Sequence, residues 1–354
     1  MGAFHWELVE RVVVSGPDGR GRKRHRAFPA TAQLRDGTLL TVYREGSDHW
    51  STPDAVIRAC RSSDGGHAWS PPETIVAKSG RTFSPHLGMR QLEDGVVLFP
   101  FIEGHSITGE PPYFRYYERL FKTACFMTSR DNCHTWSAPQ QIDLGPDVIW
   151  TGAYGDVIGG DRGEALVSVA WQREGESFYR AGLLRFAADY QSWTGPIQIT
   201  VGLDDEWSLC RLPSGRILAV FRDWDRPSKQ CFSDDGGRTW SEPQPVPFHG
   251  QCPSLLQTQA GVLLCAFRQK GPGKPHGVGL AYSYDGGSTW EEADPLYVAT
   301  DGLWDCAYPN LLETRPGEFL ACYYTAALGM MQIDHHRRYA DADNAIEAVR
   351  FRER

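Results

Sequence analysis

The sequence predicts an all-β protein, a six-bladed β-propeller, and three observations predict it. A hairpin motif recurs four times, a strand–turn–strand unit recurs six times, and helical periodicity is absent over most of the 354 residues. The 37 glycines and 23 prolines punctuate the chain, as short strands and tight turns require. Repeated small sheets of this kind are stable when they pack in a closed ring around a common axis.

The hairpin motif, an Asp-box, has the pattern Ser-x-Asp-x-Gly-x-Thr-Trp. Its aspartate is expected to accept hydrogen bonds from amides of the turn, its glycine to take a positive φ, and its tryptophan to pack back on the sheet. The second copy has Cys133 where glycine is expected, and a decayed copy is predicted around Asp189 and Trp193. The four clear copies lie at residues 62–69, 129–136, 233–240 and 283–290.

Each strand–turn–strand unit has a turn residue directly before a glycine, and its second strand is an apolar run. The mean spacing of the turn residues is about 56 residues, which is enough for four short strands. A strand from Trp6 to Val14 is expected to join one from Ala345 to Arg352 in the sixth blade, which closes the ring. We therefore expect residues 1–354 to form a single domain. The six turn residues are Asp36, Asp94, Arg162, Ser214, Ala260 and Pro316.

Composition and charge exclude several classes of function. The net charge of −8 argues against a nucleic-acid partner, which would need a basic face. No stretch is apolar enough to span a membrane, and the first residues lack a signal-peptide pattern, so the sequence as written predicts a cytoplasmic protein without a membrane partner. Nine cysteines without a Cys-x-x-Cys pair predict buried free thiols. We expect no metal and no cofactor.

The six turns provide a common register for comparing blades. Because all blades share one geometry, residues at equal distances from their turns should point to equivalent places. Arginine ends an apolar run at the position eight residues after the turn in three blades, where a buried charge needs an acidic partner or an anionic ligand. These arginines are Arg44, Arg222 and Arg268, and the residues eight positions before the turns are Phe28, His86, Tyr154, Glu206, Cys252 and Tyr308.

With these motifs the chain resembles the sialidase (neuraminidase) superfamily over nearly its whole length. The segment from Glu206 to Arg222 is similar to the sialidase segment in which a glutamate opens a blade and a binding arginine closes the next strand. The residues around Tyr308 are similar to the segment that carries the tyrosine nucleophile of the family. The resemblance implies an exo-glycosidase that acts on an acidic sugar or a related glycoside with retention of configuration.

The resemblance also implies the roles of individual residues. Tyr308 is the expected nucleophile and Glu206 its base, because a neutral phenol is not repelled by an anionic sugar. The acid/base is expected on a first-blade loop, where Asp48 is the first choice and His49 the rival. The expected carbohydrate-binding residues are Arg44, Arg222, Arg268, His86 and Tyr154.

The arginines depart from the family pattern. Ala27 stands where sialidases have their first carboxylate-binding arginine, with Arg26 one position off, and Lys274 lies in the segment expected to carry the third. Either Arg44 and Arg268 rebuild the carboxylate clamp, or the substrate is not sialic acid. Two other functions stay open. One is a polysaccharide lyase or uronate-processing enzyme that uses histidine, tyrosine and arginine, and the other is a propeller that binds glycans without catalysis.

Overall fold

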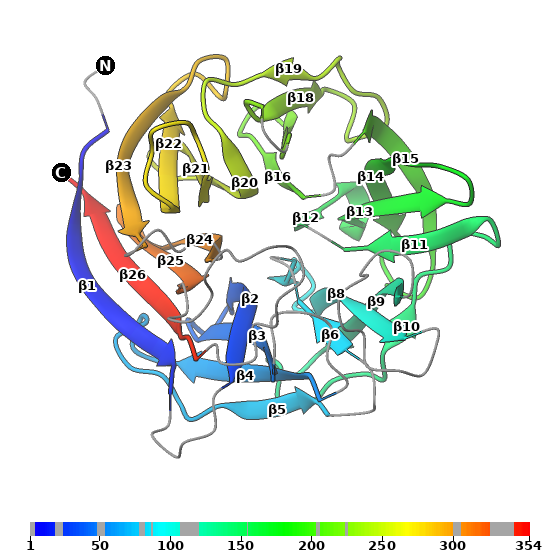
Figure 1. Cartoon of the computed structure of the whole chain (residues 1–354), viewed down its shortest axis with the longest axis horizontal. Coiled ribbons are helices and arrows are strands. Elements are labelled where there is room, and N and C mark those ends of the chain that lie inside the picture. The colour runs from blue at the N-terminus through cyan, green and yellow to red at the C-terminus, as the bar shows by residue number, and fades with distance from the viewer. Residues whose placement is uncertain are drawn as a thin grey trace.

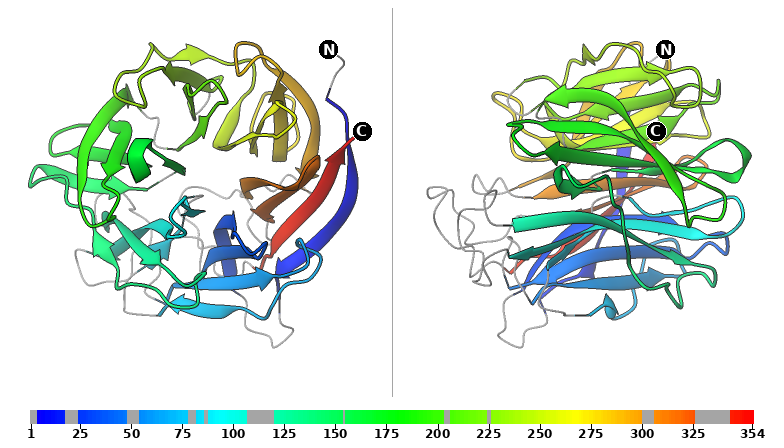
Figure 2. Two further views of the ribbon diagram at one scale, coloured as in Figure 1. Left: turned by 180° about the vertical axis from the view of Figure 1, so that it is seen from behind. Right: turned by 90° about the vertical axis from the view of Figure 1, so that its right-hand side faces the viewer.

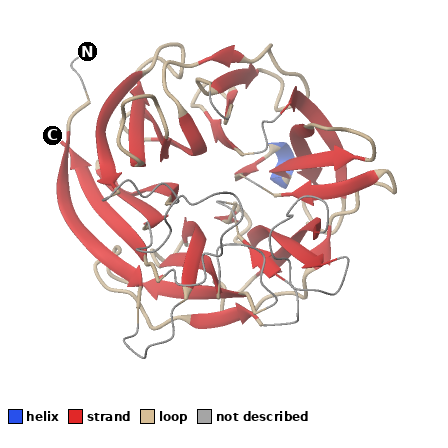
Figure 3. Ribbon diagram, in the orientation of Figure 1, coloured by secondary structure: helices blue, strands red, loops and turns tan. Residues whose placement is uncertain are grey.

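Six antiparallel sheets surround a common axis in the computed structural model (Figure 1). The structure describes residues 4–17, 24–47, 54–77, 82–85, 88–106, 120–153, 155–202, 206–223, 226–299, 306–325 and 343–354. Within these ranges the regular structure is almost entirely β, with one 3-10 turn at Asp161–Gly163 (Figure 3). No helix in the described part of the chain is long and apolar enough to cross a membrane. The predicted all-β, six-bladed architecture is confirmed.

The blades follow one another along the chain, and each has its first strand at the inner edge of its sheet. Blade 1 comprises β2 (His25–Gln33), β3 (Leu39–Gly46), β4 (Val56–Ser62) and β5 (Glu73–Val76). Blade 2 comprises β6 (Thr82–Ser84), β7 (Arg90–Gln91), β8 (Val97–Ser106), β9 (Leu120–Ser129) and β10 (Gln140–Gln141). Blade 3 comprises β11 (Val148–Gly152), β12 (Val157–Gly159), β13 (Ala165–Arg173), β14 (Tyr179–Phe186) and β15 (Trp193–Gly202).

The last three blades have four strands each. Blade 4 comprises β16 (Trp207–Arg211), β17 (Ile217–Phe221), β18 (Lys229–Ser233) and β19 (Gln244–Pro245). Blade 5 comprises β20 (Gly250–Gln257), β21 (Leu263–Gln269), β22 (Gly277–Ser283) and β23 (Glu291–Val298). Blade 6 comprises β24 (Ala307–Arg315), β25 (Glu318–Tyr324), β26 (Ile346–Glu353) and β1 (Trp6–Ser15).

The first strand closes the ring, as the sequence predicts. β1 pairs antiparallel with β26, from Trp6 opposite Glu353 to Ser15 opposite Ile346. Both ends of the chain therefore lie at the rim of blade 6 (Figures 1 and 2). The first strand of the chain thus forms the outer edge of the sheet that begins with β24, so pairing between strands distant in sequence holds the ring closed.

The Asp-boxes have the predicted hairpin geometry. In the first, the Asp64 carboxylate accepts hydrogen bonds from the amides of His67 and Ala68, both at 3.0 Å. Gly66 has φ +91°, and a Cβ there would lie 2.5 Å from Leu320 of blade 6, so this turn wedges between two blades. Cys133 of the second box also takes a positive φ, of 65°, in place of glycine. The hairpin of the first Asp-box thus also packs into the interface between two blades.

A chain of side-chain hydrogen bonds links the inner strands of neighbouring blades. In each link, the side chain six residues before one turn accepts a hydrogen bond from the amide five residues before the next. The amide of Leu209 donates to Asp156 at 2.8 Å, that of Leu255 to Ser208 at 2.9 Å, that of Leu311 to Ser254 at 3.1 Å, and that of Thr31 to Asn310 at 2.9 Å. Four successive interfaces, from blade 3 round to blade 1, are fixed in this way. We call these bonds the axial links.

The Asp156 link is expected to make stability depend on pH. Burial raises the pKa of Asp156 from 3.8 to about 6, although the hydroxyl of Ser208 and the amide of Leu209 both donate to its carboxylate. A raised pKa means that the folded chain holds the proton more tightly, so the contribution of this group to stability is complete below about pH 4 and is lost as the pH rises through about 6.

We expect Asp156→Ala to lower the free energy of unfolding at pH 7 by about 1–3 kcal/mol, because two donors lose their acceptor. Asp156→Asn keeps an acceptor but cannot titrate, so its unfolding free energy should vary less between pH 4 and pH 7 than that of the wild type. Urea denaturation at several pH values measures both effects. An Asn variant with the pH dependence of the wild type would contradict this account.

Candidate active site

Three inner strands begin with the same irregularity, and it sets the direction of the candidate site residues. Phe28, Cys252 and Tyr308 each precede a proline and have positive φ, at 59°, 50° and 46°. The pairing of each strand with its neighbour shifts register at this point. Positive φ costs a bulky residue about 1–3 kcal/mol and persists only where the surroundings impose it. All three side chains lie in one buried cluster next to the axis.

The structure brings Tyr308 and Glu206 together, one from blade 6 and one from the start of blade 4. The Tyr308 hydroxyl donates a hydrogen bond to Oε1 of Glu206. The other carboxylate oxygen, Oε2, lies 2.8 Å from Nη1 of Arg222. All three side chains are buried, with 5–6% of each residue exposed. Backbone pairing supports the arrangement, because the Arg222 amide donates to the Glu206 carbonyl at 2.9 Å.

Cys252 is a further member of this cluster, although the sequence predicts it only as a buried free thiol. Its thiol donates to Oε2 of Glu206, with Sγ 2.9 Å from the oxygen. Burial raises the pKa of Cys252 well above 9.0, so the thiol is protonated and can only donate here. The signal that could have found it is the dipeptide Cys252-Pro253, which matches Tyr308-Pro309 at the same register position. All nine cysteines are free and buried, as the sequence predicts.

The surroundings keep the Tyr308 phenol neutral in the resting site. Burial raises the pKa of Tyr308 well above 10.0, the Cys252 thiol and the Glu206 carboxylate raise it further, and Arg268 and Arg222 lower it. The phenol cannot lose its proton to water near neutral pH. It can pass the proton to Glu206, which is already its hydrogen-bond acceptor.

The three arginines of the shared register have different neighbours. Arg222 pairs with Glu206, whereas Arg268 lies with its Cζ 5.0 Å from the centre of the Tyr308 ring. Arg44 is 1% exposed on β3, opposite Ala27 of β2. Arg26, one position from the family site, bonds Asp343 at 3.1 Å, and Lys274 bonds Glu292 at 3.0 Å on the exposed rim. Neither Arg26 nor Lys274 contacts the Tyr308 cluster through these bonds.

Four predicted site residues, Asp48, His49, His86 and Tyr154, lie outside the described residues, so their roles stay predictions. Both ends of the loop that carries Asp48 and His49 are described. The Ser47 hydroxyl donates to Oδ1 of Asp54 at 3.0 Å, and Arg24 bonds the other oxygen of Asp54 at 2.7 Å. Hydrogen bonds between Ser47 and Asp54 thus connect the two described ends of the first-blade loop.

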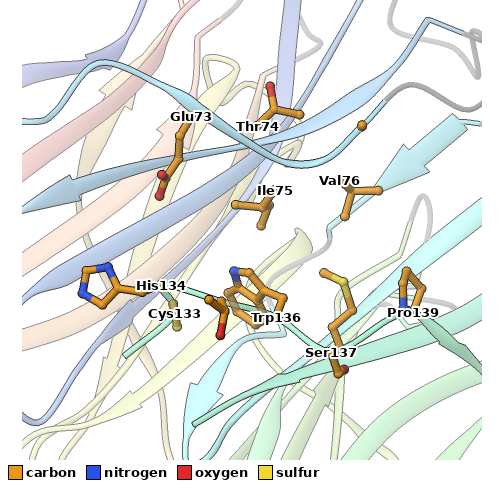
Figure 4. A pocket seen from close by; sticks show the side chains of 12 residues that line it. Glu73, Thr74, Ile75, Val76, Cys133, His134, Trp136, Ser137 and Pro139 are labelled. Atoms are coloured by element: carbon orange, nitrogen blue, oxygen red, sulfur yellow. The ribbon is translucent and has the colours of Figure 1, made fainter. Parts of the chain in front are cut away.

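A separate hollow of about 400 Å³ lies between blades 1 and 2 (Figure 4). It is lined by β5 residues such as Ile75 and Val76 and by the second Asp-box, including His134 and Trp136. None of the predicted site residues lines it. In the described ranges, no group of three or more His, Cys, Asp or Glu side chains is arranged to hold a metal ion.

Known proteins with similar sequences share the repeats described above. The family model described as BNR repeat-like domain matches residues 117–319. This chain belongs to the BNR repeat-like domain family. A curated relative, a sialidase from Micromonospora viridifaciens, is 24% identical to this BNR repeat-like chain over 90% of its length, and the match spans 54% of that relative. The chain thus spans about half the length of the curated relative.

Solved structures share the fold of this BNR repeat-like protein. A protein of unknown function from Dyadobacter fermentans superimposes with a TM-score of 0.80 at 22% identity, covering 99% of both chains. The NanB sialidase from Streptococcus pneumoniae superimposes with a TM-score of 0.73 at 11% identity, covering 96% of this chain and 70% of the other. These likenesses establish the sialidase-like propeller fold.

The shared carboxylate predicts a large effect of Glu206 on stability. We expect Glu206→Ala to lower the free energy of unfolding by about 3–5 kcal/mol, because Tyr308, Cys252 and Arg222 lose a common buried partner. Glu206→Gln should cost less, since it keeps the volume and one acceptor. Denaturant unfolding measures both. As a control, Glu164→Ala removes the more exposed partner of Arg185 and should cost less than about 1 kcal/mol; equal losses at the two sites would contradict the expectation.

Proposed function

We propose that this protein is a sialidase-like exo-glycosidase that hydrolyses the glycosidic bond of an acidic sugar, or of a related glycoside, with retention of configuration. The observation that carries the proposal is the buried hydrogen bond from the Tyr308 hydroxyl to Glu206. A carboxylate would suit a neutral sugar as nucleophile, but it would repel an anionic one, whereas a phenol attacks without this repulsion. The curated relative named as a sialidase supports the same reaction class.

In the proposed first step, the Tyr308 oxygen attacks the anomeric carbon while its proton passes to Glu206. The bond from the anomeric carbon to the departing oxygen breaks, and that oxygen takes a proton from the acid/base, for which we propose Asp48, with His49 as the rival. In the second step, water attacks the anomeric carbon and returns its proton to the acid/base. The Tyr308 oxygen leaves the sugar and recovers its proton from Glu206.

Arg222 is proposed to act on the base Glu206 and on the acidic sugar. Its guanidinium, 2.8 Å from the Glu206 carboxylate, holds the base in place and partly offsets its charge. The acidic class of substrate rests on buried arginines at the register positions of blades 1 and 4, Arg44 and Arg222. We propose Arg44, His86 and Tyr154 as further residues that contact the sugar.

Turnover of a panel of aryl glycosides tests the proposal. The panel contains the 4-methylumbelliferyl glycosides of N-acetylneuraminic acid, glucuronic acid and neutral hexoses. We expect cleavage of at least one acidic member, a fall in kcat of at least about a thousandfold in Tyr308→Phe, and a fall of about a hundredfold or more in Glu206→Gln. The first product, followed by NMR, should keep the anomeric configuration of the substrate.

Four outcomes would overturn the proposal. The first is a panel in which no sugar is cleaved, and the second is a Tyr308→Phe variant as active as the wild type. The third is an unsaturated, ultraviolet-absorbing product from uronic-acid polymers, which would identify a lyase instead. Binding of a sugar without its consumption over long incubation would identify a glycan-binding protein.

A further inference from the structure

Arg268 differs from the other register arginines in what it touches. It lies on β21 of blade 5 and is 6% exposed. Its guanidinium carbon is 5.0 Å from the centre of the Tyr308 ring, within the range of a cation–π contact. Arg222, at the same position in blade 4, contacts the carboxylate of Glu206 instead. The two arginines therefore act on different members of the Tyr308–Glu206 pair.

Each nitrogen of the Arg268 guanidinium faces a protein acceptor. Nε donates to the Cys306 carbonyl at 2.7 Å, Nη2 to the Tyr324 hydroxyl at 2.8 Å, and Nη1 to the side-chain oxygen of Gln251 at 3.4 Å. These bonds fix the plane of the guanidinium. They leave its broad face, rather than its donor edge, as the part that contacts Tyr308.

The same bonds reach the backbone that carries Tyr308. Cys306 directly precedes Ala307 and Tyr308, whose φ values are +85° and +46°. A hydrogen bond to the Cys306 carbonyl thus holds the peptide at the start of this strained turn. Tyr324, the other partner, stacks on Tyr308 with ring centres 6.0 Å apart and an angle of 30° between the planes. Arg268 therefore contacts the Tyr308 ring, the Cys306 carbonyl at the start of its turn, and the Tyr324 side chain that stacks on it.

We propose that Arg268 is a positioning residue for Tyr308: it holds the ring in the orientation for attack, and it stabilises negative charge on the ring when the phenol oxygen leaves the sugar. The inference rests on the proposed function. When the bond from the Tyr308 oxygen to the anomeric carbon breaks, the electron pair returns to the oxygen and spreads over the ring before Glu206 returns the proton. A cation over the face of the ring stabilises that charge in a buried site.

A positioning role predicts an effect on the second step rather than on substrate affinity. The phenolate is the leaving group of the second step. Loss of the cation should therefore slow the loss of the covalent adduct more than its formation. A residue that bound the sugar carboxylate would instead raise KM. Kinetics that separate the two steps can therefore distinguish the two roles.

Trapping uses the fluorinated glycosyl fluoride of the panel sugar that the wild type cleaves, which is a 3-fluorosialosyl fluoride if that sugar is N-acetylneuraminic acid. It separates the steps because the anomeric fluoride leaves without help from an acid, while the ring fluorine slows both steps. Intact-mass spectrometry follows the appearance and the loss of the covalent adduct. For Arg268→Met we expect adduct loss to slow by about tenfold to thirtyfold relative to the wild type, and adduct formation to slow less. With the 4-methylumbelliferyl glycoside of the same sugar, kcat and KM should both fall, because the intermediate accumulates.

Three further variants serve as controls. Arg268→Lys keeps the charge but cannot donate to both Cys306 and Tyr324, so it should rescue part of the rate of adduct loss. Tyr324→Phe removes the acceptor of Nη2 and should slow adduct loss less than Arg268→Met does. Arg185→Met removes a mostly buried arginine that pairs with Glu164 at 2.7 Å in blade 3, so it should lower the melting temperature without changing either rate.

The outcomes separate this inference from the proposed function. Wild-type rates of adduct loss in Arg268→Met, or a raised KM with unchanged kcat, would overturn the inference. If Arg268→Met does not fold, wild-type rates in both Arg268→Lys and Tyr324→Phe would overturn it instead. Failure of the wild type to form an adduct with the fluorinated analogue of a panel sugar that it cleaves, or formation of the same adduct by Tyr308→Phe, would overturn the proposed function itself.

Discussion

The axial links hold the inner strands of five neighbouring blades, from blade 3 round to blade 1, at fixed spacing, and the candidate site depends on that spacing. Each link joins a side chain six residues before a turn to the next inner strand. Glu206 lies two positions before the linking residue Ser208, and Tyr308 lies two positions before the linking residue Asn310. A shift of one blade relative to the next would move the Glu206 and Tyr308 side chains apart. The axial links therefore determine the geometry of the Tyr308–Glu206 pair.

The chemistry of the cluster follows from sharing one carboxylate among several donors. Glu206 accepts from a phenol and a thiol and pairs with a guanidinium, all of them buried. A buried carboxylate needs such partners to replace the hydration that it loses. The same burial keeps the phenol of Tyr308 protonated. The site thus stores a proton on the nucleophile beside a base that can receive it.

Counting residues from repeated turns predicted much of this arrangement. The positions of the six turns predicted the blades, the closure by β1 and the register that Glu206 and Tyr308 share, because every blade repeats one hydrogen-bonding pattern. The thiol bond of Cys252 and the contact of Arg268 with Tyr308 could not be predicted in this way. They depend on a backbone irregularity before proline and on distances across blade interfaces, which the register does not specify. Arg222 and Arg268 hold equal positions in the sequence repeat, yet their neighbours differ.

Closure of the ring by β1 and β26 has a consequence for how the chain reaches its native state during synthesis. β1 is made before every other strand of the propeller, but its partner β26 ends at Glu353. Leu8, Val9 and Val13 stay 47–56% exposed even in the finished sheet, and before it forms nothing in blade 6 can cover the backbone of this strand. On the ribosome, β1 must therefore remain an unpaired strand until all six blades have been translated. During this interval its free edge can pair with strands of other nascent chains.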